Sequence, residues 1–133
     1  MKVRWLRILV AAFVYEVALI ALTIPLTFFI AMEDLVPAVP AIVLVVGFPF
    51  GMWVARTLTS GFVVHGILVG IVATAMYLGL ILATSGGSLQ PVIDLYGPVA
   101  FFLANALKVA GCAVGAYVAG RKRALVPEIE HQL

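Results

Sequence analysis

The chain consists of four long apolar stretches separated by three short breaks. The apolar stretches cover residues 5–30, 37–56, 61–84 and 92–120. Each is long enough to cross a hydrocarbon core of about 30 Å, which needs roughly 20 apolar residues in a helix. The stretches are continuously apolar and do not alternate with polar residues, which favours helices over the strands of a membrane barrel. We therefore predict an all-α integral membrane protein, a single domain built as a bundle of four transmembrane helices.

The composition excludes the main soluble classes. Of 133 residues, 65% are hydrophobic and 11% are charged, whereas a soluble domain carries about 25% charged residues. Disorder needs low hydrophobicity and high charge, so it is excluded as well. The net charge is only +2 and the basic residues are scattered, so nucleic acid is not an expected partner. The expected partners are the lipid bilayer and, for so small a unit, a second copy or a larger membrane protein.

The charges outside the apolar stretches predict the orientation. Seven of the eight basic residues fall on one side of the four-span topology: Lys2, Arg4, Arg7, Arg56, Arg121, Lys122 and Arg123. The other side holds only the acidic residues Glu33, Asp34 and Asp94. The positive-inside rule then places both termini in the cytoplasm, with residues 121–133 as a cytoplasmic tail. The first stretch is too long for a secretory signal and contains Glu16, so we expect an uncleaved span.

Small residues recur in the second and fourth spans. Residues 47–55 and 111–119 both read G-x-x-x-G-x-aromatic-V-A, at a constant offset of 64 residues. This repeat suggests two tandem helical hairpins of the same orientation, related by an axis along the membrane normal. Small residues let helices approach closely in lipid, either within one chain or between two copies. The residues predicted for helix packing are Gly47, Gly51, Ala55, Gly66, Gly70, Gly111, Gly115 and Ala119.

Two ionisable residues lie deep inside predicted spans. Glu16 and Lys108 are each 11 to 12 residues from the basic side, which is roughly 17 Å at 1.5 Å per residue. Equal depth and opposite charge predict an ion pair. Asn105 lies one turn from Lys108, and Thr23 shares a polar stripe with Glu16, so these four residues form a candidate intramembrane polar site.

Two interpretations of this pair remain open. The two charges can neutralise each other and fix the helix register, or Glu16 can carry a proton or cation in transport. The second interpretation resembles the single essential glutamate in the first helix of small multidrug transporters, which also have four spans. Those proteins are shorter, and their other helix motifs have no match in this chain.

Arg56 lies at the basic side of the second span, and His65 lies near the basic side of the third span. A histidine there is a hydrogen-bonded packing residue, a ligand or a proton relay. No metal-ligand spacing, cofactor motif or nucleophile with a nearby base occurs in the sequence, and the lone Cys112 is expected at a helix contact. We therefore expect no metal, no cofactor and no catalytic residue.

Around the second break, Gly51, Ala55 and Arg56 end one predicted helix, and His65, Gly66 and Gly70 open the next. With these residues the chain resembles a family of small, uncharacterised four-helix bacterial membrane proteins, in which a helix end with glycine, alanine and a basic residue leads through a short turn into a helix that opens H-G-x-x-x-G. The match covers about a quarter of the chain and implies a four-helix topology and a bacterial source; that family has no assigned activity.

These observations favour a non-enzymatic role. The first expectation is a helix-packing or accessory subunit in which Glu16 and Lys108 form a structural pair. The alternative is a small proton- or cation-coupled transporter that uses the same pair. An enzyme acting on lipid or quinone comes third, since no motif supports it.

Overall fold

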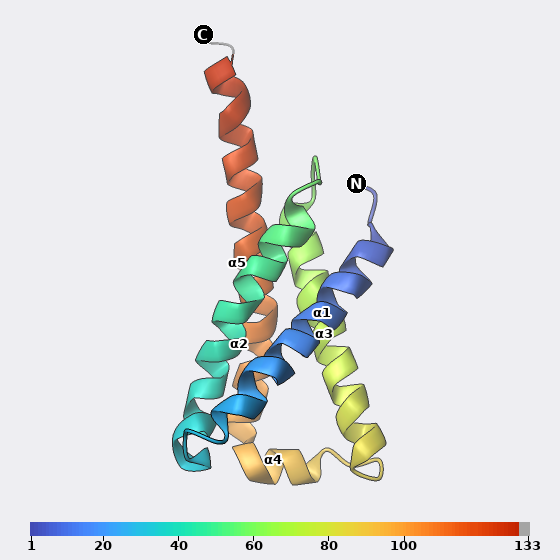
Figure 1. Ribbon diagram of the computed structural model, residues 1–133. Helices are drawn as coiled ribbons and strands as arrows, with labels where there is room; N and C mark the ends of the chain where they lie inside the picture. The colour runs from blue at the N-terminus through green and yellow to red at the C-terminus, as the bar shows by residue number, and fades with distance from the viewer. Residues whose placement is uncertain (131–133) are drawn as a thin grey trace.

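The computed structural model describes the backbone of residues 1–130 and the side chains of residues 1–124. This part of the chain forms helices and no strands, as Figure 1 shows: α1 (Trp5–Leu26), α2 (Met32–Ala55), α3 (Phe62–Thr84), α4 (Gln90–Tyr96) and α5 (Pro98–Glu130). Four segments are long and apolar enough to cross a membrane, namely α1, α2, α3 and the Pro98–Ala124 part of α5. The predicted all-α bundle with four transmembrane helices is confirmed, and the protein is a multi-pass membrane protein.

The two ends of the bundle differ in charge. The N-terminus and the end of α5 at Glu130 lie at one end, where α1 begins, α2 ends and α3 begins (Figure 1). We call it the basic end because it carries Arg4, Arg7 and Arg56. At the opposite end lie the connection between α1 and α2 and the short helix α4. We call it the acidic end because Glu33, Asp34 and Asp94 lie there.

The first two helices are displaced from the predicted spans 5–30 and 37–56. α1 ends at Leu26, and the following turn exposes Phe28 and Phe29. α2 begins at Met32, five residues earlier than predicted, and therefore includes Glu33 and Asp34 in its first turn. Negative side chains stabilise a helix N-terminus because the backbone N–H groups there carry partial positive charge. The acidic pair was expected to lie between spans, but it begins the second one.

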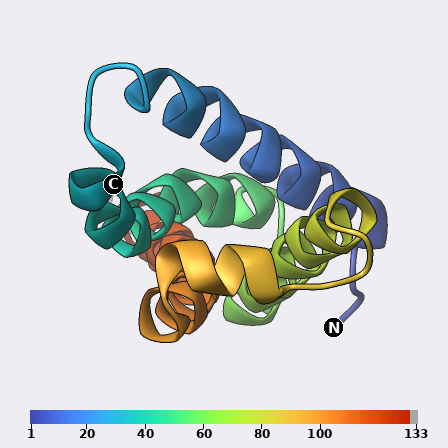
Figure 2. The ribbon, with the colours of Figure 1, turned by 90° about the horizontal axis from the view of Figure 1, so that it is seen from below.

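The predicted fourth span, residues 92–120, is wrong at its start. Two helices occupy this region, and they are separated by Gly97, which has a φ of 78° that favours glycine. Pro98 then opens α5, a position where the missing N–H costs no helical hydrogen bond. α4 lies across the acidic end of the bundle (Figure 2). α5 continues as a helix through the predicted tail as far as Glu130, and residues 131–133 of that tail lie outside the described part of the chain.

The buried core is formed by side chains of α1, α2 and α3 together with Cys112 of α5, and α5 packs closely against α2 and α3. α2 and α5 run in the same direction, from the acidic end to the basic end. A Cβ atom at Gly51 would overlap the carbonyl oxygen of Cys112, and one at Gly115 would overlap that of Phe48. A Cβ atom at Gly111 would overlap the carbonyl oxygen of Leu44. Glycine is therefore required for the two backbones to touch at this level.

The α3 side of α5 is built in the same way. A Cβ at Gly66 would overlap the carbonyl oxygen of Cys112, and one at Gly70 would lie too close to the backbone of Val109. Cys112 is fully buried, and Ala55 on α2 is fully buried as well, whereas Ala119 is half-buried. The glycines singled out in the sequence thus contact other helices of the same chain.

Arginine side chains join the helices at the basic end. Arg7 on α1 donates hydrogen bonds to the carbonyl oxygen of Trp53 at 2.7 Å and to the hydroxyl of Thr57. Arg123 on α5 donates to the carbonyl oxygen of Leu58 at 2.5 Å. Both contacts hold the connection between α2 and α3. At the acidic end the described side chains form no hydrogen bond between helices.

Candidate functional site

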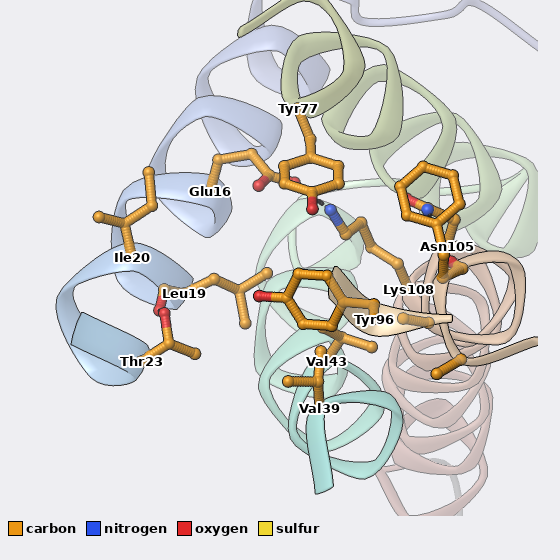
Figure 3. A pocket seen from close by; sticks show the side chains of 13 residues that line it. Glu16, Leu19, Ile20, Thr23, Val39, Val43, Tyr77, Tyr96, Asn105 and Lys108 are labelled. Carbon is orange, nitrogen blue, oxygen red and sulfur yellow. Dashed lines mark hydrogen bonds and ion pairs between the residues drawn. The ribbon is translucent and has the colours of Figure 1, made fainter. Parts of the chain in front are cut away.

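An ion pair crosses the interior of the bundle at mid-depth. Lys108 Nζ on α5 donates a hydrogen bond to Glu16 Oε1 on α1 at 2.6 Å. The side chains are 4% and 12% exposed, respectively. α1 and α5 lie on different sides of the bundle, and the two side chains point toward one another between them (Figures 2 and 3). The pair therefore links α1 to α5 across the bundle.

Aromatic rings surround the ammonium group of Lys108. Its Nζ lies 4.5 Å from the ring centroid of Tyr77 and 5.9 Å from that of Tyr15. An ammonium group near an aromatic face is stabilised by the ring quadrupole, more strongly when water is excluded. The Tyr15 hydroxyl is anchored because it donates to the carbonyl oxygen of Val43 at 2.5 Å. The charge of Lys108 is thus compensated by Glu16 and by two rings.

A cavity of about 100 Å³ lies on the acidic-end side of the ion pair (Figure 3). A water molecule takes up about 30 Å³ in the liquid, so the cavity has room for a few waters. All five helices contribute to its lining, which includes Glu16, Leu19 and Thr23 of α1, Val43 of α2, Tyr77 of α3, Tyr96 of α4, and Asn105 and Lys108 of α5. The Glu16–Lys108 pair forms its polar wall.

The structure brings the four residues of the predicted polar site to this one cavity. Glu16 and Lys108 form the pair, and Asn105 and Thr23 line the same space. The Asn105 amide nitrogen donates to the carbonyl oxygen of Phe101 at 2.9 Å, and the Thr23 hydroxyl donates to that of Leu19 at 2.7 Å. Both side chains are oriented by their own helices, and their oxygens can still accept a hydrogen bond.

Two tyrosines complete the site, and neither was predicted to belong to it. Tyr77 lies inside α3. A tyrosine within a membrane span could have been recognised in the sequence as a candidate for the polar site, because a buried phenol hydroxyl usually has a hydrogen-bond partner. Tyr96 is the last residue of α4. It reaches the cavity because the chain turns at Gly97. Among the described residues, neither phenol hydroxyl has a hydrogen-bond partner.

His65 and Arg56 lie away from this cavity, at the basic end. His65 is fully buried. Its Nδ1 is 2.8 Å from the carbonyl oxygen of Gly61, and its Nε2 accepts a hydrogen bond from the backbone N–H of Arg4 at 3.3 Å. This arrangement places the imidazole proton on Nδ1 and ties the N-terminus to α3. His65 is a hydrogen-bonded packing residue in this structure, whereas Arg56 is exposed.

The histidine contact leads to a testable prediction. In His65→Leu the Arg4 amide loses its acceptor, so its exchange with solvent deuterium is expected to become about fivefold faster, equivalent to about 1 kcal/mol for one hydrogen bond. Hydrogen exchange of the N-terminal peptide measures this change. His65→Gln, which can still accept a hydrogen bond, serves as the conservative control. Unchanged exchange in His65→Leu would show that this contact does not hold the N-terminus.

The described residues provide no other evident chemical centre. Within residues 1–124, no group of three His, Cys, Asp or Glu side chains is close enough to hold a metal ion. Cys112 is a free, buried thiol. No protein-family profile, curated protein or solved structure matches this chain. The interpretation of the site therefore rests on its own geometry.

Proposed function

We propose that this protein is a non-enzymatic accessory or helix-packing subunit of a bacterial cytoplasmic membrane. The observation that carries the proposal is the buried Glu16–Lys108 pair, which joins α1 to a core packed through glycines. Removing two charges from water is costly unless they are paired, so such a pair favours one arrangement of the helices over others. Glu16 and Lys108 are then structural residues.

The proposed orientation has both termini in the cytoplasm. The support is the charge difference between the two ends, because lysine and arginine accumulate in cytoplasmic loops. The proposed partner is a second copy of the chain or a larger membrane protein, since a four-span unit of 133 residues is small.

A tandem duplication of a helical hairpin is also part of the proposal. Its support is a pair of reciprocal contacts between α2 and α5. Gly51 contacts Cys112, while Gly115 contacts Phe48. Positions 51 and 115 differ by 64, and so do positions 48 and 112, so the two contacts correspond under the sequence offset. Such an exchange is what a twofold relation between two similar hairpins produces.

A second candidate function is a small proton- or cation-coupled transporter. The observation that favours it is the cavity that reaches Glu16 and Lys108 from the acidic-end side. Space for a few waters beside a carboxylate provides a path for a proton. On the basic-end side the pair is followed by closely packed residues, including Ile8, Val54 and Val69, which are fully buried. Transport would require these helices to separate.

A flux assay in proteoliposomes distinguishes the two candidates. The accessory role predicts that the wild type, Glu16→Gln and Lys108→Met show the same proton and cation leak as empty vesicles, while both variants melt at a lower temperature in detergent. The transporter predicts flux in the wild type that Glu16→Gln abolishes. Lys122→Met, at an exposed site, is the control for a change of net charge. Flux that depends on Glu16 would refute the accessory role.

A further inference from the structure

A groove lies between α1 and α3 on the outer surface of the bundle. It has a volume of about 430 Å³ and an almost entirely apolar lining. Phe13, Val17 and Leu80 line it and are 60%, 48% and 51% exposed. These residues belong to membrane-spanning helices. Whatever occupies the groove must therefore enter from the bilayer and must carry an apolar chain.

The groove and the inner cavity share one wall. Glu16, Ile20 and Tyr77 line both spaces. Figure 3 shows Glu16 and Tyr77 directed toward Lys108, and Ile20 one turn from Glu16 on α1. A molecule lying in the groove thus meets the only charged side chain of its lining, Glu16, at the point where the cavity begins. Glu16 is thus the residue of the predicted polar site that borders the groove between α1 and α3.

The charges of Glu16 and Lys108 determine which kind of head group can bind at this wall. Glu16 and Lys108 already neutralise each other at 2.6 Å. A charged head would leave one net charge in a medium of low dielectric constant, which is costly. A hydroxyl group avoids this cost because it both donates and accepts. It can donate to the Glu16 carboxylate and accept from the Lys108 ammonium or from the Tyr77 hydroxyl, which has no partner among the described residues.

We propose that the groove and the cavity together bind a single-chain membrane amphiphile with an uncharged hydroxyl head. Its chain lies between α1 and α3, and its hydroxyl reaches the Glu16–Lys108 pair beside Tyr77. This site stands independently of whether the protein is an accessory subunit or a transporter, because it requires neither a protein partner nor flux.

Photolabelling in proteoliposomes tests the proposal. The probes are hexadecanol, hexadecanoic acid and hexadecyltrimethylammonium, each with the same diazirine in the chain. We expect hexadecanol to label peptides of α1 and α3, with saturation, and excess unlabelled hexadecanol to suppress this labelling. The acid and the ammonium compound are expected to label the same peptides several-fold less. Peptide mass spectrometry reads out the labelled positions.

Two variants and their matched controls locate the site. Tyr77→Phe keeps the ring beside Lys108 and is expected to weaken hexadecanol binding about fivefold, the effect of one hydrogen bond. The control is Tyr117→Phe, on the outer surface of α5. Ile20→Trp fills the shared wall and is expected to abolish saturable labelling, whereas Ile24→Trp, one turn further on α1 and outside both linings, leaves it intact. Protection of Cys112 from maleimide verifies that each variant is folded.

Three results would overturn the proposal. Equal, non-saturable labelling by all three probes would mean that only bulk lipid contacts the groove. Stronger labelling by the acid or by the ammonium compound would mean that the ion pair opens for a charged head. Saturable hexadecanol labelling that survives both Tyr77→Phe and Ile20→Trp would place the binding site elsewhere.

Discussion

Replacing Lys108 by methionine is expected to lower the free energy of unfolding by about 3–5 kcal/mol, the usual cost of breaking a buried ion pair from one side. The reason is that Glu16, whose side chain is only 12% exposed, then remains in the bundle without its counter-charge. The loss should far exceed that of Lys122→Met, because Lys122 is exposed at the end of the transmembrane part of α5.

The double variant Glu16→Gln/Lys108→Met is expected to recover most of this loss. It removes both charges and therefore leaves no unpaired one, and replacing a complete pair is often nearly neutral. Thermal unfolding in detergent, followed by circular dichroism, measures the stability of the wild type, of Glu16→Gln, of Lys108→Met and of the double variant. If the double variant is as unstable as the sum of the two single variants, the two charges do not compensate each other in the folded protein.

Replacing Gly51 by alanine is expected to destabilise the protein by about 1–3 kcal/mol through overpacking. The new methyl group would overlap the carbonyl oxygen of Cys112 and lie 2.7 Å from its carbonyl carbon. These atoms belong to the backbone of α5, so no side-chain rotation can relieve the overlap. α2 and α5 must separate, and the core loses contacts along its length.

Gly79→Ala provides the matched control, because Gly79 lies inside α3 with nothing within 4 Å of an added Cβ. Alanine is favoured over glycine in a helix by about 1 kcal/mol, so this variant is expected to be neutral or slightly more stable. Alkylation of Cys112 is a direct measurement, since the thiol is fully buried between the helices. If Gly51→Ala alkylates at the wild-type rate, the α2–α5 contact is looser than the structure indicates.

Much of the candidate site could be predicted from the sequence, because charged and polar residues are rare within apolar membrane spans and are easily recognised there. Glu16 and Lys108 stood out as charges inside apolar spans, and their equal distance from the basic side was enough to predict that they meet. Asn105 and Thr23 followed from helical periodicity. Tyr77 was missed because a tyrosine is half apolar, so its position within a span carries a weaker signal than a charge does.

The boundaries of the helices were harder to predict, because hydropathy reports how apolar a segment is and not whether its helix crosses the membrane or lies along the membrane surface. Residues 92–120 read as one span, although the chain turns at Gly97 and α4 lies across the bundle. A short apolar helix at the membrane surface and the first turns of a spanning helix have the same composition. That turn is what brings Tyr96 to the cavity.

The sequence by itself determined that the chain spans the membrane with four helices, which residues allow close packing, and which two buried charges must neutralise each other. These properties follow from the cost of placing polar groups in lipid, and that cost depends only on residue type and spacing. Only the tertiary structure decided that α5 packs closely against both α2 and α3, that α4 contributes a tyrosine to the site, and that Glu16, Ile20 and Tyr77 line both an inner cavity and a groove open to lipid. Those features depend on the angles at which the helices cross and on the turn at Gly97, which residue spacing along the chain does not specify.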